Sequence, residues 1–166
     1  FAVCTCDTFQ GNSQLTTDAF DSRVGAYNVD GNVFNDGHIG VNGALAAGLK
    51  LNVGGSLYVS GGNLVTPGNS SVVYSAHVSG DYNVSNSNMS VGHAVHLGGA
   101  KTGGGGLTVG ETLYIANEAN KGSATYASLI QQPYAIDVAC PCGTDEILDI
   151  AGLTAWASDP DNNDND

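Results

Sequence analysis

Residues 29–57 repeat one short unit three times: Val29-Asp-Gly31-Asn-Val33, Val41-Asn-Gly43-Ala-Leu45 and Val53-Gly-Gly55-Ser-Leu57. Each unit starts 12 residues after the previous one, and Val78-Ser-Gly80-Asp-Tyr82 repeats it further along the chain. Within a unit, apolar residues alternate with small or polar ones, which is the period of a strand with one buried face. The glycines indicate turns, or places where two backbones approach closely. The pattern therefore predicts many short strands of fixed spacing.

This repeat favours an all-β fold, the parallel β-solenoid (β-helix), because each unit buries its apolar side only by stacking on the next. A longer match, Asn52-Val-Gly-Gly-Ser-Leu-Tyr-Val59 with Thr108-Val-Gly-Glu-Thr-Leu-Tyr-Ile115, supports it. We expect stacked parallel strands over residues 24–116, a coil of two units on opposing faces, and a protruding loop at residues 64–71. The alternative is a β-sandwich whose glycine-rich turns imitate a repeat. Eight side chains are predicted to point inward: Val29, Val33, Val41, Leu45, Val53, Leu57, Val78 and Val109.

Three segments differ in composition. Residues 1–23 hold a Cys-x-Cys pair and a possible helix around residues 16–22, residues 24–131 form the repetitive solenoid, and residues 132–166 hold Cys-Pro-Cys, a helical pattern and an acidic tail. In the last segment Thr144 is a suitable helix cap, and Ser158-Asp-Pro160 ends the pattern. We expect a short C-terminal helix that caps the last coil, with one face formed by Ile147, Ile150, Ala151 and Thr154.

The charge of the chain excludes several classes of partner. The net charge is −12, and only four residues are Lys or Arg. Such a chain repels phosphate backbones, so we expect no nucleic acid partner and no attraction to anionic membranes. No apolar run approaches the ~20 residues that span a bilayer. The chain begins with Phe1, has no signal peptide, and is interpreted as a mature, processed product.

Four cysteines lie near the two ends of the chain, in Cys4-Thr-Cys6 and Cys140-Pro-Cys142. An even number in a chain of secreted character predicts disulfides. On a strand, Cys-x-Cys points both thiols to one face, so two such segments side by side would form two cross-links. The pairing stays open, within one subunit or between neighbours. A four-thiolate zinc site is the alternative, although structural zinc motifs usually space their thiols by two or more residues.

The acidic tail is a candidate metal site. Four carboxylates alternate with asparagine amides and one proline in the last eight residues, at Asp159, Asp161, Asp164 and Asp166. Calcium takes 6–8 oxygen ligands of this kind, so the tail predicts a Ca²⁺ site. The pattern lacks the glycine and the distal glutamate of an EF-hand loop, and a solvated acidic tail is the alternative.

Catalytic patterns are weak throughout the sequence. No nucleophile elbow surrounds any serine, and the run Gly103–Gly106 lacks the lysine of a phosphate loop. The four histidines, His38, His77, His93 and His96, are interpreted as solvated or turn residues, and His93 and His96 fall on opposite faces of a strand. A polysaccharide-active enzyme would need clustered carboxylates. The acids of the repeat zone are well spread: Asp30, Asp36, Asp81, Glu111 and Glu118. We expect no enzymatic activity.

The run Tyr27-Asn-Val-Asp-Gly-Asn-Val33, then Ile39-Gly-Val-Asn-Gly43, then Leu51-Asn-Val-Gly-Gly-Ser-Leu-Tyr-Val59 resembles the bacterial choice-of-anchor A domains. The resemblance covers about residues 24–116, and bactofilin-like and ice-binding-like solenoids share such units. It implies a secreted or surface-displayed β-rich module linked to adhesion or matrix, with no catalytic residues to carry over. The chain departs from this family in having Cys-Pro-Cys and an acidic tail in place of a sorting motif or membrane anchor, which leaves room for self-assembly.

These observations predict an extracellular structural protein of the cell surface, a filament, matrix or surface-layer subunit that contacts copies of itself through its N- and C-terminal segments. The alternative is an adhesin-type or ice-binding module that recognises a surface glycan, carbohydrate or matrix. An ice binder needs a flat, regular threonine face, whereas threonine is scattered here, at Thr66, Thr102, Thr108 and Thr112.

Overall fold

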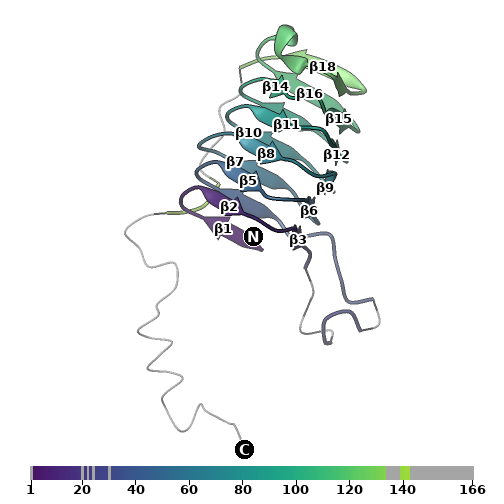
Figure 1. Cartoon of the computed structure of the whole chain (residues 1–166). Coiled ribbons are helices and arrows are strands. Elements are labelled where there is room, and N and C mark those ends of the chain that lie inside the picture. The colour runs from purple at the N-terminus through teal and green to yellow at the C-terminus, as the bar shows by residue number, and fades with distance from the viewer. Residues whose placement is uncertain are drawn as a thin grey trace, which may run out of the picture.

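A computed structural model of the chain describes residues 2–19, 21, 23, 25–29, 31–133 and 139–142. Figure 1 shows short strands stacked coil upon coil along one axis, with β1 near one end and β18 at the other. The strands of successive coils pair in parallel and form three sheets. The predicted β-solenoid is confirmed, and the β-sandwich alternative is wrong.

The three sheets are the three sides of the coil. Sheet A contains β1 (Val3–Thr5), β4 (Ile39–Val41), β7 (Leu57–Val59), β10 (Ala76–Val78), β13 (Val95–Leu97), β16 (Thr112–Ile115) and β18 (Ser128–Gln131). Sheet B contains β2 (Phe9–Gly11), β5 (Leu45–Ala47), β8 (Leu64–Thr66), β11 (Tyr82–Val84) and β14 (Lys101–Thr102). Sheet C contains β3 (Leu15–Thr17), β6 (Leu51–Val53), β9 (Ser70–Val72), β12 (Asn88–Val91), β15 (Gly106–Val109) and β17 (Ala124–Thr125).

Each side of a coil takes six residues, since β4, β5, β6 and β7 begin at residues 39, 45, 51 and 57. The 12-residue recurrence in the sequence therefore spans two of three sides, and the expected coil of two opposing units is wrong. Residues 64–71 are not a protruding loop either, because they contain β8 and the start of β9. The turn from β7 to β8 absorbs one extra residue, since Leu57 and Leu64 are seven apart.

The core fills the space between the three sheets. In the three-residue strands of the middle coils, the first and third residues are buried and the central one is half-buried on the outer face. Full burial of such a side chain contributes roughly 1.5–3 kcal/mol. Of the eight residues predicted to point inward, six are buried: Val41, Leu45, Val53, Leu57, Val78 and Val109. Val29 is 51% exposed and Val33 is half-buried, so these two predictions are wrong.

Val29 and Val33 lie in an excursion, residues 18–37, that leaves the solenoid after β3 and returns at β4. Hydrogen bonds connect its described residues: the buried Asn32 amide donates to the carbonyl oxygens of Asp21 (2.9 Å) and Gly25 (2.9 Å). The repeat unit here is thus a turn, with Gly31 at φ +77°. Glycine adopts this left-handed backbone conformation without strain.

The turns between strands are tightly packed against the neighbouring coil. A Cβ atom on Gly61 would lie 1.8 Å from the backbone oxygen of Asn42, one coil below. Such a contact is impossible without moving one backbone relative to the other. Close approach of two backbones therefore explains this glycine, as the sequence predicted.

The solenoid starts at Val3, whereas the sequence placed its start at residue 24. Strands β1, β2 and β3 pair with β4, β5 and β6 of the next coil, and β3 lies where a short helix was expected around residues 16–22. Among the residues that the structure describes, the one helix is η1 (Glu118–Lys121), a single 3₁₀ turn at the last coil. None of the described helices is long and apolar enough to cross a membrane. The predicted C-terminal helix lies outside the described residues.

The two valines that open repeat units provide a matched test of this fold. We expect Val53→Ala to lower the free energy of unfolding by about 2 kcal/mol, because it removes buried methyl groups and leaves a cavity. Val29→Ala should change it by less than about 0.5 kcal/mol, because that side chain is exposed. Urea unfolding with the disulfides intact measures both. Equal effects of the two substitutions would contradict the assignment of residue 29 to a surface turn.

Candidate functional site

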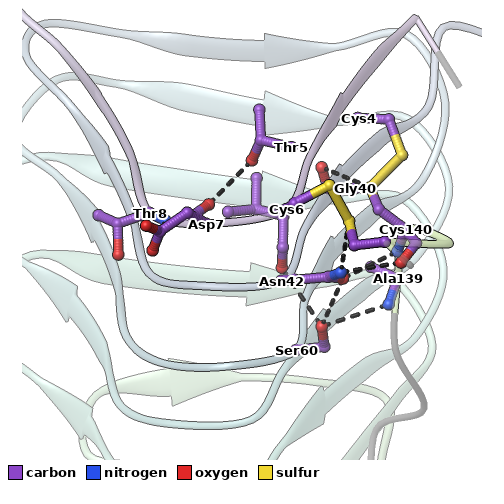
Figure 2. Close-up of a disulfide and its surroundings, with 12 residues drawn as sticks. Cys4, Thr5, Cys6, Asp7, Thr8, Gly40, Asn42, Ser60, Ala139 and Cys140 are labelled. Carbon is purple, nitrogen blue, oxygen red and sulfur yellow. Dashed lines mark hydrogen bonds between the residues drawn. A yellow bond between two sulfur atoms is a disulfide. The ribbon is translucent and has the colours of Figure 1, made fainter. Parts of the chain in front are cut away.

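The four cysteines form two disulfides, Cys4–Cys140 and Cys6–Cys142, each between residues 136 apart in sequence. The prediction that the cysteines are oxidised is confirmed, and both bonds lie within one chain. This pairing leaves no thiolate for the zinc site considered above. The two bonds fasten residues 139–142 to the outside of the first coils, and we call this region the clasp (Figure 2).

The clasp sits on the outer face of sheet A, next to a glycine. In the register of that sheet, Gly40 lies between Cys4 of β1 and Tyr58 of β7. Cys140 is fully buried there, and its Sγ atom lies 3.2 Å from the Gly40 carbonyl oxygen. An outward side chain at position 40 would occupy the space of Cys140, since strand residues alternate between the two faces.

One asparagine side chain holds the segment through both polar atoms of its amide group. The Asn42 Nδ2 atom donates to the carbonyl oxygen of Cys140 (2.8 Å), and Asn42 Oδ1 accepts from the backbone N–H of Cys140 (2.8 Å). Ser60 supports the pair: its Oγ donates to Asn42 Oδ1 (3.2 Å) and accepts from the backbone N–H of Ala139 (3.2 Å). Figure 2 shows Asn42 bonded to Cys140, and Ser60 bonded to Asn42 and to Ala139. The Asn42 amide thus substitutes for a strand partner of residue 140.

Residues 132 and 139, close in sequence, are bonded at well-separated coils. The backbone N–H of Gln132 donates to Ile115 at the last coil (3.1 Å), whereas Ala139 is bonded to Ser60 beside β7. In sheet A, β18 and β7 are four strand spacings apart, or about 19 Å. The C-terminal segment is therefore anchored at the end of the solenoid where the chain begins.

Either disulfide alone closes the long loop, so the stabilising effects of the two bonds should not simply add. By the loop model, closing 136 residues restricts the unfolded chain by roughly 5 kcal/mol, whereas the second bond closes a ring of a few residues and adds about 2 kcal/mol. We expect the pair Cys4→Ser with Cys140→Ser, or the pair Cys6→Ser with Cys142→Ser, to cost about 2 kcal/mol each. All four substitutions together should cost roughly 7 kcal/mol. Urea unfolding of the three variants measures these losses in the free energy of unfolding. A loss in the fourfold variant equal to the sum of the losses in the two paired variants would contradict the prediction.

A column of stacked rings continues from the clasp along sheet A. The central residues of four successive strands are Tyr58, His77, His96 and Tyr114. Their ring centroids are 4.7, 4.5 and 4.2 Å apart, and neighbouring planes differ by 15°, 6° and 5°. Parallel register explains the stack, because equivalent residues of neighbouring strands lie about 4.8 Å apart. The interpretation of His77 and His96 as solvated residues is wrong, since both are half-buried in this column.

Burial changes the titration of the two stacked histidines. Burial lowers the pKa of His77 to about 4, with repulsion from a charged His96 as a second cause. Burial also lowers the pKa of His96. The other two histidines lie elsewhere: His93 is exposed in the turn before β13, with its Nδ1 3.1 Å from Glu111 Oε1, and the Nδ1 of His38 accepts from the backbone N–H of Ser56 (2.8 Å).

Acid should therefore destabilise the solenoid. Because the pKa of His77 lies below its ordinary 6.5, the unfolded chain binds more protons than the folded chain between about pH 4 and 6.5. The stabilising effect is complete above about pH 6.5 and is lost as the pH falls toward 4. We expect Tm to fall over this range, and His77→Phe to reduce that fall while keeping the stack. His93→Phe, in the exposed turn, is the control. Equal pH profiles for wild type and His77→Phe would contradict the prediction.

Acids of the repeat zone that the structure describes have structural partners. Asp81 Oδ1 accepts from the backbone N–H of Ala100 (2.8 Å), and Glu118 pairs with Lys121 (2.6 Å). Within the described ranges, no three His, Cys, Asp or Glu side chains form a metal-binding group. A core cavity lined by Leu64, Tyr82 and Met89, among others, measures about 10 Å³. Small-molecule sites measure roughly 300–1,000 Å³. The acid Asp30 and the calcium candidates Asp159, Asp161, Asp164 and Asp166 lie outside the described residues.

Sheet C carries a regular polar column that the sequence analysis missed. Its outward residues, in register order, are Thr16, Asn52, Ser71, Ser90, Thr108 and Thr125. Neighbours in this column hydrogen-bond, as in Ser71 Oγ to Asn52 Oδ1 (3.1 Å). Thr66, by contrast, is fully buried and bonds the hydroxyl of Tyr82 (3.0 Å). The column was missed because only every third six-residue unit faces this side.

Comparisons of the chain with protein-family models, with curated proteins and with solved structures each gave no significant match. The resemblance to choice-of-anchor A domains therefore stays a prediction.

Proposed function

We propose that the protein is a non-catalytic structural subunit of an extracellular surface, which assembles with copies of itself into a filament or layer. The observation that carries the proposal is the partial exposure of apolar core residues in the two end coils. Apolar residues of the core are half-buried in the first coil, at Val3, Phe9 and Leu15, and in the last, at Ala124, Tyr126 and Leu129. The coils between them bury the equivalent positions almost completely.

Free strand edges add to this argument. Strands β1 and β18 are the two edges of sheet A, β2 and β3 are edges of sheets B and C in the first coil, and β17 is the other edge of sheet C. Exposed edges offer unpaired backbone groups that another strand can satisfy. Contacts between opposite ends of identical subunits generate open polymers when the rotation does not close a ring. A copy of this chain supplies edges that match in direction, because its strands run parallel.

The clasp supports an extracellular location. Disulfides persist in oxidising compartments and are rare in reducing ones. Two of them close nearly the full length of this chain. A protein exposed on a surface gains durability from such cross-links, which supports a structural role for the solenoid.

Calcium is the proposed mediator of assembly. A net charge of −12 makes copies of the chain repel one another. Asp159, Asp161, Asp164 and Asp166 provide the carboxylates that a divalent cation would bridge between neighbours. Monovalent salt screens charge without coordinating it, so salt would not replace calcium.

Light scattering on the full chain tests the proposal. We expect the mass to increase with protein concentration and with added CaCl₂, and to fall after chelation. Leu129→Lys places a charge at the open edge of the last coil and should reduce assembly. Thr108→Lys adds the same charge to the outer face of β15 and is the control, with little effect expected.

A monomeric mass under all these conditions would overturn self-assembly and leave the second candidate, a module that binds a surface or carbohydrate. The polar column of sheet C favours that candidate, because it presents hydroxyl and amide groups at a regular spacing along one side.

A further inference from the structure

Asn42 and Gly43 form the only Asn-Gly pair in the sequence. Such a pair is especially prone to deamidation, because glycine has no side chain to hinder the attack of its backbone nitrogen on the asparagine amide. Asn42 is also the residue that pairs with Cys140 in the clasp. A chemically unstable pair of residues therefore lies where the two ends of the chain are joined.

The structure requires both residues of this pair. A Cβ atom on Gly43 would collide with the backbone nitrogen of Thr8, so a larger residue would push the first two coils apart. The Asn42 side chain needs a donor and an acceptor at once, because it pairs with both the C=O and the N–H of Cys140. An ionised aspartate offers acceptors alone. Packing of the coils and pairing in the clasp thus explain why an unstable pair stands at this position.

The closed clasp holds the Asn42 amide away from the reaction. The Nδ2 atom donates to the carbonyl oxygen of Cys140 (2.8 Å) and to the Sγ atom of Cys142 (3.0 Å). The Oδ1 atom accepts from Ser60 Oγ (3.2 Å) and from the backbone N–H of Cys140 (2.8 Å). Deamidation requires the side chain to turn until its Cγ atom meets the Gly43 nitrogen, which breaks these bonds. A group held in this way reacts only through rare local openings.

We propose that Asn42 is a site of self-modification, which the closed clasp suppresses and which keeps the clasp from closing again once it has been reduced. A dithiol first reduces both disulfides, and two dithiol molecules are oxidised in return. The Gly43 nitrogen then attacks the Asn42 Cγ atom, a C–N bond forms, and the side-chain nitrogen leaves as ammonia with the proton of the Gly43 N–H. Water opens the resulting succinimide to aspartate or isoaspartate. This inference goes beyond the proposed function, since it concerns a single chain and does not depend on assembly.

The product would hold the clasp poorly. An aspartate places a carboxylate oxygen where Nδ2 now faces the Cys140 carbonyl, so two acceptors meet in place of a hydrogen bond. The added negative charge would also disfavour the thiolate of Cys142, from which the disulfide must form. Isoaspartate adds a methylene group to the backbone and shifts the turn after β4. A passing reduction would thereby become a permanent change in the protein.

Peptide mass spectrometry on the full chain measures the modification, after incubation at mildly alkaline pH with and without excess dithiothreitol. We expect deamidation of Asn42 to be at least about tenfold faster in the reduced chain. Ser60→Ala removes one bond to Asn42 Oδ1 and leaves both disulfides intact, so it should speed the reaction in the oxidised chain. Asn86, which is exposed and followed by a serine, is the internal control and should react equally in all samples. If the reductant unfolds the coils and Asn86 also responds, the oxidised Ser60→Ala chain decides.

Asn42→Asp tests the consequence of the modification. We expect this variant to lose its disulfides at about tenfold less dithiothreitol than the wild type, because the pairing with Cys140 is lost. It should also re-form them more slowly after the reductant is removed. Asn83→Asp adds the same charge at the outward position of β11, away from the clasp, and is the matched control. Thiol labelling followed by intact-mass measurement counts the open disulfides.

Two results would overturn the inference. The first is an equal rate of deamidation at Asn42 in the oxidised wild type, the reduced wild type and the oxidised Ser60→Ala chain, which would show that the clasp does not protect this residue. The second is an Asn42→Asp chain that opens and recloses like Asn83→Asp, which would show that the product does not impair the clasp. Neither measurement involves assembly, so failure here leaves the proposed function to its own test.

Discussion

Parallel, in-register pairing between successive coils is the constraint on which the rest of this structure depends. It requires each coil to return to the same position after about 18 residues, so that every side chain lies directly above its equivalent one coil below. Inward positions then become continuous apolar columns, and outward positions become columns of like neighbours. The stack of Tyr58, His77, His96 and Tyr114 is one result of this geometry, and the polar column of sheet C is another. Side chains on one face meet by register and not by proximity in sequence.

The clasp uses the same geometry in a different way. Gly40 interrupts an outward column, and the vacant position accepts Cys140 from the far end of the chain. Asn42 then forms with its side chain the two bonds that a neighbouring strand would form with its backbone. The covalent bonds and the amide pairing are thus two parts of a single attachment.

The fold could be predicted from the sequence because the 12-residue recurrence of the repeat unit, which spans two sides of the coil, is a local property. Val41, Leu45 and Val53 alternate with small residues at the spacing that a coil requires, and all three are buried. The same local pattern misled at Val29 and Val33, because burial depends on pairing with another coil, and the described residues of the excursion form no strand that pairs with a coil. The first three strands were missed although their first residues, Val3, Phe9 and Leu15, are six apart, because they lack the glycine of the repeat unit. The partners of Asn42 are about 100 residues away in sequence, and nothing local marks them.

The position of the disulfides has a mechanical consequence. A solenoid normally loses its coils one at a time from the ends, since each coil contacts only its neighbours. In this chain a pull on the two termini enters at Cys4 and leaves at Cys142, and the covalent path between them runs through the sulfur atoms. The coils between the cysteines lie outside that path and carry none of the load. The solenoid is therefore a shielded loop, and tension applied to the two ends of the chain would be borne by the clasp while the β-structure stayed folded.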